Sequence, residues 1–409
     1  MPAGDGRPAG WPGEPVYLDY NATTPVDARV AEAARPYLDQ WFGNPSSSHA
    51  YGDQPRQAIA RGRAQIAALI GAEPGEIVFT GSGSEADQLA IRGAVLANLR
   101  AAPGTTPRVI TQVTEHPAVL ATCEALERWH GAHVTWLPVD ASGLVDPAAV
   151  ADALTRPSDD RGPAVVSVML ANNETGAMQP IPQIAAAAHA HGAVLHVDAA
   201  QAAGKITIDV GELGADLLTV VGHKMYAPKG IAALYVRAGL ALEPVIYGGG
   251  QERGLRGGTE NVALIAALGT AAQVAAQDLA DGAESRLASL RDRLHTHLAA
   301  ALPGQVELNG PPDRLPTTLN ISITGLRGDE LLDAVPAIAA STGSACHSGQ
   351  HTPSPVLTAM GLDEDRALAA IRLSVGRWTT QADVDVAASQ LAAAALRLAR
   401  LQRFPLLKG

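Results

Sequence analysis

The sequence predicts an α/β protein with a mostly parallel sheet, because short apolar runs alternate with alanine-rich helical stretches. The apolar runs are rich in β-branched residues and lack a regular polar–apolar alternation, which is typical of strands covered by helices on both faces. The chain has 409 residues, of which 47% are hydrophobic, so it can bury a large core and form two or three domains.

Seven apolar runs are the candidate strands of this sheet. Helical stretches follow most of them, as expected for crossovers between parallel strands. Ligands of such sheets bind at the carboxyl ends of the strands, so the residues that follow each run are candidates for a site. The runs are EIVFT (76–80), RVITQV (108–113), HVTWLPV (133–139), AVVSVML (164–170), AVLHVDAA (193–200), ADLLTVVG (215–222) and IAALYVR (231–237).

The composition changes along the chain and predicts three segments. Residues 1–15 are rich in Pro and Gly without the apolar core of a signal peptide, and we expect a flexible tail there. Residues 16–262 contain the strand–helix alternation and form the predicted large domain, whereas residues 263–409 form a smaller α+β domain. Towards the C-terminus we expect helices over 262–301 (broken near Asp281-Gly282), over ELLDAVPAIA (330–339) and over 381–401.

Charge and cysteine content argue against several classes of function. Acidic residues outnumber basic ones 41 to 30, and the resulting net charge of -11 argues against nucleic acid as a partner. The two cysteines cannot form a disulfide framework, so we expect a reducing, cytoplasmic compartment. The apolar windows are broken well short of about 18 residues, so we expect no membrane span. We assign no metal site.

Lysine is rare in this chain, and Lys224 directly follows a predicted strand in Val-Gly-His-Lys (221–224). Desolvation at such a place disfavours the charged ammonium, and a neutral amine can form a Schiff base with an aldehyde. A surface lysine in a turn is the alternative. The rarity of lysine and the motifs described next favour the chemical role.

Asp198 and Gln201 lie in His-Val-Asp-Ala-Ala-Gln, at the end of the run 193–200. A carboxylate buried there needs a partner, and the protonated nitrogen of a pyridine ring would serve. A helix N-cap aspartate is the alternative. One further strand–helix–strand step separates Asp198 from Lys224, so both side chains can face one crevice.

A Gly- and Ser-rich loop, Thr-Gly-Ser-Gly-Ser-Glu (80–85), joins a predicted strand to a predicted helix. Backbone N–H groups and hydroxyls at a helix N-terminus form an anion cup, here around Gly83 and Ser84. Thr259, in Arg-Gly-Gly-Thr-Glu-Asn, could add a hydroxyl to a phosphate. The loop lacks the lysine of a Walker A sequence and the full dinucleotide-binding fingerprint, and an ordinary capped loop is the alternative.

Two further strand ends carry candidate ligand contacts. His116 follows the run 108–113, and its imidazole could stack on a planar ring, with a hydrogen-bonded loop histidine as the alternative. Asn173 lies in Asn-Asn-Glu-Thr-Gly (172–176) after the run 164–170. Its amide can donate to a phenolate or carboxylate oxygen, and an Asn-rich turn is the alternative.

The C-terminal part contributes a thiol and a guanidinium. Cys346 lies in a small polar loop beside His347, and a neighbouring imidazole raises the thiolate fraction of a cysteine. Cys123 lies in an apolar helical stretch, and we expect it to be inert packing. Arg372 is the favoured carboxylate binder and Arg377 the second choice, with a surface ion pair as the alternative for both.

Taken together, these motifs resemble the class V aminotransferase family, fold-type I enzymes that use pyridoxal phosphate. The resemblance runs from Tyr-Leu-Asp-Tyr-Asn-Ala-Thr-Thr-Pro (17–25) to Arg-Leu-Ser-Val-Gly-Arg (372–377). It is strongest to the branch that contains NifS/IscS-type cysteine desulfurases and selenocysteine lyases. It implies a seven-stranded, mostly parallel sheet in the large domain, a smaller α+β domain, and a homodimer.

The resemblance also implies roles for individual residues. The residues implied in catalysis are Lys224, which binds the cofactor covalently, Cys346, which takes up sulfur, and His116. The other implied cofactor contacts are Asp198 at the ring nitrogen, His116 on the ring, Gln201 and Asn173 near the phenolic oxygen, Gly83, Ser84 and His223 at the phosphate, and Thr259 from the partner subunit. The implied substrate contacts are Arg372 at the carboxylate, with Asn21 and Asn173 nearby.

The implied activity is that of a cysteine desulfurase, which converts L-cysteine to L-alanine and leaves a persulfide on Cys346. Val221 stands where many desulfurases carry a serine that contacts the phosphate. Selenocysteine lyases are resembled by the Val-Gly-His-Lys sequence that contains Val221 and by the Leu-Ala-Asn-Asn-Glu-Thr-Gly and Ala-Cys-His-Ser motifs. Release of selenium from L-selenocysteine is therefore the alternative activity. Weaker alternatives are another class V aminotransferase or lyase, a non-catalytic sulfur-relay protein and an NAD-binding protein. A sulfur-acceptor protein, for example in iron–sulfur cluster assembly, is an implied partner.

Overall fold

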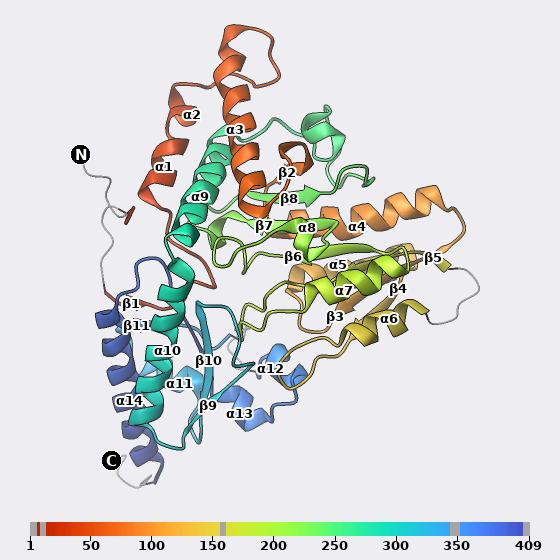
Figure 1. Cartoon of the computed structure of the whole chain (residues 1–409). Coiled ribbons are helices and arrows are strands. Elements are labelled where there is room, and N and C mark those ends of the chain that lie inside the picture. Colours follow the sequence, from red (N-terminus) through yellow and green to blue (C-terminus); the bar gives the residue numbers. More distant parts are fainter. Residues whose placement is uncertain (1–5, 9–13, 156–160, 344–351, 404–409) are drawn as a thin grey trace.

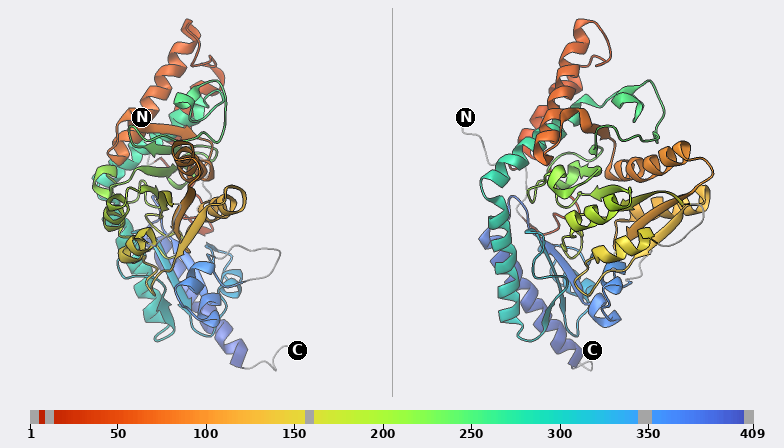
Figure 2. Two further views of the ribbon diagram at one scale, coloured as in Figure 1. Left: turned by 90° about the vertical axis from the view of Figure 1, so that its right-hand side faces the viewer. Right: turned by 45° about the vertical axis from the view of Figure 1, so that its right-hand side comes forward.

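The computed structural model describes residues 6–8, 14–155, 161–343 and 352–403. Most of the predicted tail (1–15) and the predicted sulfur acceptor Cys346 lie outside the described residues. Gly6 contacts the body of the protein, because its carbonyl oxygen accepts a hydrogen bond from the N–H of Ala28 at 2.9 Å. Figures 1 and 2 show a larger part built on a central sheet and a smaller part that contains the last helix.

A seven-stranded sheet forms the centre of the larger part, as predicted (Figure 1). Its strand order is β2-β8-β7-β6-β5-β3-β4, and β8 runs antiparallel to both neighbours while the other pairs are parallel. Every residue of β2, β7 and β8 is buried, which explains the missing polar–apolar alternation. The strands are β2 (Ile77–Thr80), β3 (Thr106–Gln112), β4 (His133–Leu137), β5 (Arg161–Ser167), β6 (Val194–Asp198), β7 (Leu217–Val221) and β8 (Ala232–Val236).

The chain continues along the sheet beyond the end of β5. The N–H of Leu170 donates to the carbonyl oxygen of Asp198, the last residue of β6, at 2.8 Å. This pairing explains why the apolar run 164–170 extends beyond the strand itself. It also carries the Asn-Asn-Glu-Thr-Gly turn (172–176) to the carboxyl end of β6, where the candidate site residues gather.

Helices cover both faces of the sheet. On one face, α4 (Gly83–Ala101) and α5 (Pro117–His130) enclose a core that includes Leu89, Cys123 and Leu126. Cys123 is fully buried, and burial raises the pKa of its thiol to about 12, as expected for a packing role. The core of the other face is formed with α1 (Ala28–Ala34), α3 (Asp53–Ile70), α6 (Pro147–Thr155), α7 (Ile181–Ala190), α8 (Val210–Leu213) and α9 (Val262–Ala280).

Two glycines let α3 and α9 approach each other closely. A Cβ atom on Gly269 would lie 2.5 Å from the Cα of Gly62, and one on Gly62 would lie 2.9 Å from the carbonyl oxygen of Ile265. Among the described residues, α9 is the one helix long and apolar enough to cross a membrane. Its residues Ala263, Ile265 and Leu268 are buried in the core against the sheet, which accounts for its apolar composition.

The smaller part has a core of its own. α10 (Ala283–Ala301) and α14 (Gln381–Arg403) lie side by side (Figure 1), and Leu294 and Leu391 are buried between them and a three-stranded sheet. α9 packs on the large sheet, and the second core begins with α10 after Asp281 and Gly282. The domain boundary after residue 262 stays a prediction. The antiparallel sheet has the order β12-β10-β9, with β9 (Val306–Leu308), β10 (Thr318–Ile323) and β12 (Ala370–Ser374).

The predicted helix over 330–339 is wrong in its second half. α11 (Gly328–Asp333) ends before Pro336, which cannot donate a backbone hydrogen bond. Ile338–Ala339 forms β11 and pairs in parallel with β1 (Val16–Tyr17), so the segment that follows β1 lies beside the smaller part. The remaining short elements are α2 (Pro36–Asp39), α12 (Pro355–Ala359), α13 (Glu364–Leu368), η1 (Ala50–Gly52), η2 (Pro74–Glu76), η3 (Gly222–Lys224) and η4 (Gln251–Gly254).

Candidate active site

A cavity of about 450 Å³ lies at the carboxyl ends of the parallel strands, where the larger part meets β12. Its lining comes from the segment after β1, from the starts of α4 and α5, and from the residues that follow β5, β6 and β7. Of the predicted site residues that the structure describes, all except Thr259 line this cavity, whereas Cys346 lies outside the described residues. The predicted residues that line it are Asn21, Gly83, Ser84, His116, Asn173, Asp198, Gln201, His223, Lys224 and Arg372.

Lys224 lies in the short helix η3, directly after β7. Its Nζ donates to the carbonyl oxygens of Asn21 and Ala22 at 2.7 and 2.8 Å. Burial, together with the nearby Arg372 guanidinium, lowers the pKa of this amine to about 8, although Asp198 opposes the shift. An appreciable fraction of the amine is therefore neutral near pH 7 and can act as a nucleophile or a base.

Three carboxyl groups are buried in and beside the cavity, on Asp198, Asp87 and Glu115. Burial raises the pKa of each, and the charge of Asp198 raises the pKa of the other two further, that of Glu115 to about 8. The N–H of Ala200 donates to Asp198 Oδ1 at 2.9 Å, and the charge of the neighbouring Lys224 also favours the charged form of Asp198. Asp198 is therefore the carboxyl group of the three that is best placed to pair with a cation in the cavity.

The two histidines of the cavity are neutral near pH 7. His116 is the N-cap of α5, and its Nδ1 accepts a hydrogen bond from the N–H of Ala118 at 3.1 Å, so the ring proton lies on Nε2. Desolvation lowers the pKa of His116, and it lowers that of His223 to about 4. His223 Nδ1 lies 3.1 Å from Thr23 Oγ1. His116 thus offers a flat, uncharged ring against which a planar ligand can stack.

The residues of the predicted anion cup lie at the N-terminus of α4. Ser82 is the N-cap, and its Oγ accepts a hydrogen bond from the N–H of Glu85 at 3.1 Å. Gly83 and Ser84 begin the helix, where backbone N–H groups have no partner within the helix and attract anions. A Cβ atom on Gly83 would lie 2.6 Å from Val221 Cγ2, so the close approach of β7 to this turn requires glycine.

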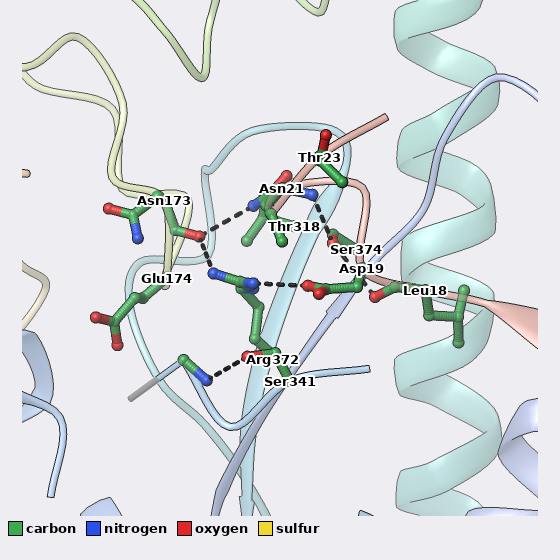
Figure 3. A network of polar contacts seen from close by, with 12 residues as sticks. Leu18, Asp19, Asn21, Thr23, Asn173, Glu174, Thr318, Ser341, Arg372 and Ser374 are labelled. Carbon is green, nitrogen blue, oxygen red and sulfur yellow. Dashed lines mark hydrogen bonds and ion pairs between the residues drawn. The ribbon is translucent and has the colours of Figure 1, made fainter. Parts of the chain in front are cut away.

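Arg372 reaches from β12 of the smaller part towards the larger part (Figure 3). Its Nη2 pairs with Asp19 Oδ1 at 2.6 Å, and its Nη1 donates to the carbonyl oxygen of Asn173 at 3.2 Å. Arg372 is buried, and within the described part of the chain its Nε has no hydrogen-bond partner. The predicted alternative, a surface ion pair, is therefore wrong, and the guanidinium keeps donor capacity for an acidic ligand.

Asn21 connects Lys224 to the hydrogen-bond network of Arg372. Figure 3 shows the part of this network around Asn21, Asn173 and Arg372. The Nδ2 of Asn21 donates to the carbonyl oxygen of Asn173 at 3.1 Å and to Thr318 Oγ1 at 2.8 Å. Its own carbonyl oxygen accepts hydrogen bonds from Lys224 Nζ and from Gln201 Nε2, the latter at 2.9 Å. The side-chain amide of Asn173 points away from this network (Figure 3), so its backbone carbonyl makes the contacts seen here.

Thr259 lies in a different cavity of the chain. That cavity, of about 270 Å³, is also lined by Arg256, and it shares Gly230 and Ile231 with the larger one. A contact of Thr259 with a ligand held by a second subunit stays a prediction. Cys346 lies outside the described residues, so its predicted role also stays a prediction.

The structure adds residues that the sequence analysis did not single out. Asp87 lines the cavity four residues after Gly83, a spacing that places both on one face of α4. Lys205 is buried and contacts Gln201, and the rarity of lysine was the signal that could have found it. Among residues 6–8, 14–155, 161–343 and 352–403, no group of His, Cys, Asp and Glu side chains is arranged to hold a metal ion.

The groups that line the cavity suit one class of ligand. They include a near-neutral amine, a buried carboxylate, a helix N-terminus and a buried guanidinium. These groups suit a planar, anionic ligand with a cationic ring atom, together with a substrate that carries a carboxylate. The Aminotransferase class-V family matches this chain over residues 16–386.

The chain belongs to the class-V aminotransferase family.

Members of this family with curated functions are similar to the chain over most of its length. A protein of Trichormus variabilis named cysteine desulfurase 2 is 45% identical over 90% of both chains. The human cysteine desulfurase is 41% identical over 91% of this chain and 79% of its own length. The similarity therefore includes both the larger and the smaller part of the fold.

Solved structures show the same fold. A NifS-like protein superposes with a TM-score of 0.83 at 32% identity and covers 94% of this chain and 99% of its own. SspA in complex with cysteine gives a TM-score of 0.76 at 36% identity, over 89% of this chain and 99% of its own. The seven-stranded, mostly parallel sheet and the smaller domain are thus those of this class-V aminotransferase branch.

Proposed function

We propose that this chain is a pyridoxal-phosphate-dependent cysteine desulfurase, which converts L-cysteine to L-alanine and transfers the sulfur to Cys346. The observation that carries the proposal is Lys224, a lysine with a pKa of about 8 in the same cavity as the buried carboxylate of Asp198 and the guanidinium of Arg372. The curated names of relatives at 41–46% identity support it.

The residues of the cavity fit pyridoxal phosphate. Burial raises the pKa of the Asp198 carboxyl, and a pyridinium nitrogen beside it would stabilise its charged form. The N-terminus of α4 at Gly83 and Ser84 suits the phosphate, and His116 suits the ring face. Lys224 would hold the aldehyde carbon. Bound there, the cofactor would supply an electron sink for negative charge that develops on the substrate Cα.

The chain's own groups then orient the substrate and move its proton. Arg372 binds the substrate carboxylate, which fixes the amino acid at the side of the cavity next to β12. Lys224 acts as the base that removes the Cα proton, because its lowered pKa places it near the working pH. Asn21 keeps the lysine within reach, since its carbonyl oxygen already accepts a hydrogen bond from Nζ at 2.7 Å.

The sulfur transfer is assigned to Cys346. Its thiolate attacks the substrate sulfur, the new S–S bond forms, and the substrate Cβ–S bond breaks. The electron pair of the broken bond stays with the substrate carbon, which is protonated to give alanine. Cysteine and the enzyme thiol thus become alanine and an enzyme persulfide, without an external oxidant or reductant.

Three further features belong to the proposal. A homodimer would bring Thr259 of one subunit to the phosphate held by the other. A cytoplasmic location would keep the Cys346 thiol reduced between turnovers. A sulfur-acceptor protein would then remove the persulfide sulfur.

The proposal is tested by comparing wild type with Cys346→Ala and, as the matched control, Cys123→Ala. Alanine formation and protein persulfide are measured after addition of L-cysteine. We expect Cys346→Ala to lose persulfide and to form alanine slower by about two orders of magnitude or more, as for other nucleophile deletions. Cys123→Ala should keep both, because the Cys123 thiol is buried and its pKa is raised to about 12.

The same assay separates the alternatives. Alanine formation from L-selenocysteine that is fast and unaffected by Cys346→Ala, with slow turnover of L-cysteine, would favour a selenocysteine lyase. Pyruvate or another keto acid as the product would favour a different reaction of the family. Full desulfurase turnover by Cys346→Ala would reject the nucleophile role of this cysteine.

A further inference from the structure

Lys205 is a buried lysine that has no role in the proposed reaction. The residue is 7% exposed, and its Nζ donates to Gln201 Oε1 at 2.6 Å and to Asn21 Oδ1 at 3.2 Å. Both partners line the cavity. Among the described residues Lys205 makes no ion pair, so the two amide oxygens are the groups that satisfy its buried amine.

These contacts fix which way both amides face. A lysine amine donates hydrogen bonds, and even the neutral form keeps two N–H groups, one for each oxygen. With its oxygen held by Lys205, Gln201 turns its NH₂ group the other way, where Nε2 donates to the carbonyl oxygen of Asn21 at 2.9 Å. That bond uses one of the two N–H groups of Gln201, and the second is free to serve a ligand in the cavity.

The same holds for Asn21. Its Oδ1 accepts from Lys205, and its Nδ2 donates to the carbonyl oxygen of Asn173 and to Thr318 Oγ1. A flipped Asn21 amide would place its NH₂ group against the lysine amine and lose these bonds. Lys205 therefore orients the side-chain amides of Gln201 and Asn21, which both line the cavity.

The charged groups around Lys205 do not stabilise its buried amine. The charged groups that act on Lys205 are Lys224 and Arg372, and both are cations that oppose its protonation. Burial also lowers the pKa of Lys205 well below its usual value. A buried amine with cationic neighbours is costly to keep, whereas its two hydrogen bonds give the amides a single orientation.

We propose that Lys205 is a positioning residue, which holds the Gln201 amide with an N–H directed at the phenolic oxygen of the cofactor. This inference rests on the proposed function, because it needs pyridoxal phosphate in the cavity. An N–H directed at that oxygen stabilises its negative charge. Loss of the bond makes the oxygen more basic, so the bound cofactor keeps its proton to a higher pH.

The test is a pH titration of the visible absorption of the holoenzyme without substrate. The variants are Lys205→Met, Gln201→Ala and the double variant. We expect each single variant to raise the midpoint pH of the colour change by about 0.5 to 1 unit, the size of one net hydrogen bond. The double variant should shift no further than Gln201→Ala alone, because both substitutions remove the same contact.

A second variant covers the case that Lys205→Met does not fold. Lys205→Gln keeps amide donors with a shorter reach, and its midpoint should lie between wild type and Gln201→Ala. A wild-type midpoint in the folded Lys205 variant, or shifts that add fully in the double variant, would overturn the inference. Wild-type protein that stays colourless with pyridoxal phosphate would instead overturn the proposed function itself.

Discussion

Arg372 is the residue on which the proposed binding of the substrate carboxylate depends most directly. It is buried on β12, it pairs with Asp19, and within the described part of the chain its Nε lacks a partner. A planar guanidinium can keep the contacts to Asp19 and to the carbonyl of Asn173 while still offering an N–H to a substrate carboxylate. A lysine ammonium has one charged centre and cannot serve all of these directions.

We therefore expect Arg372→Lys to raise the KM for L-cysteine by about 10- to 100-fold, since a hydrogen bond between charged groups contributes about 1.5–3 kcal/mol. Steady-state rates of alanine formation give KM and kcat separately. Arg366→Lys is the control, because Arg366 bonds to Asn309 and to the carbonyl of Leu308 in the smaller part. An unchanged KM in Arg372→Lys would contradict the carboxylate role.

Lys224 leads to a prediction about the cofactor-free protein. Its pKa is lowered from 10.5 to about 8, so between these values the unfolded chain binds more protons than the folded one. Wild-type stability therefore rises as pH rises from about 8 to about 10.5. Below pH 8 the buried ammonium costs about 3 kcal/mol, a cost that Lys224→Met removes.

The measurement is urea unfolding of both cofactor-free proteins at pH 7 and at pH 10.5. Lys224→Met should be more stable than wild type at pH 7, and this advantage should shrink at the higher pH. The exposed Lys229 supplies the control, because Lys229→Met should show no such trend. An advantage that does not change with pH would mean that the amine is not desolvated in the fold.

The residues of the site were more predictable than their contacts. Strand ends and motifs in the sequence pointed to Lys224, Asp198 and His116, and the fold brings them to one cavity. The sequence could not reveal the bond from Lys205 to Asn21 or the pair of Asp19 with Arg372, because these contacts join segments far apart in the chain. Contacts of this kind depend on how the two parts of the molecule pack.

At the scale of the elements, the buried acid Glu174 joins the turn after β5 to the start of α12. Glu174 Oε2 accepts a hydrogen bond from Ser354 Oγ at 2.5 Å, and Ser354 is the N-cap of α12. Burial raises the pKa of Glu174 from 4.5 to about 7, although Ser354 and Arg372 oppose the shift. The folded chain thus binds a proton that the unfolded chain releases, and stability falls as pH rises from about 4.5 to about 7.

Glu174→Gln removes this titration but keeps an acceptor for Ser354. At pH 8 we expect it to be more stable than wild type by up to about 3 kcal/mol, and near pH 4 the two should be equal. Thermal or urea unfolding at both pH values measures the difference. Glu124→Gln, at an exposed position of α5, should change little at either pH. Equal stability of Glu174→Gln and wild type at pH 8 would contradict the buried-acid interpretation.

The contact between α3 and α9 leads to a prediction about packing. Alanine favours a helix over glycine by about 1 kcal/mol, but a Cβ atom on Gly269 would lie 2.5 Å from the Cα of Gly62. We expect Gly269→Ala to destabilise the protein by about 1–3 kcal/mol, because overpacking outweighs propensity. Chemical denaturation measures this, with Gly75→Ala as the control in open space. A stabilised Gly269→Ala would show that the helices are further apart.

Element types were predictable where packing and local preference agree. All seven strands of the large sheet follow from their apolar runs, and the break between α9 and α10 follows from Gly282. The antiparallel direction of β8 has no local signal, since its buried residues look like those of its parallel neighbours. The end of α11 before Pro336 was readable, because proline interrupts a helix.

In the molecule as a whole, the cavity depends on both cores. Asn21 follows β1, which pairs with β11, whereas Lys224 follows β7 and Arg372 lies on β12. Arg372 bonds to Asp19 and to the carbonyl oxygen of Asn173, and these two contacts join segments far apart in the chain (Figure 3). The sequence predicted both parts, but the change of core at Gly282 could not be read from it, because the packing of α9 on the large sheet depends on contacts with segments far away in the chain.

We propose above that Lys224 is the lysine that holds pyridoxal phosphate. Borohydride reduction of the purified holoprotein, followed by peptide mass spectrometry, locates the attached cofactor. We expect the added mass on the peptide that contains Lys224 and none on Lys205 or Lys229. Added mass on another lysine, or protein that stays colourless after incubation with the cofactor, would contradict it.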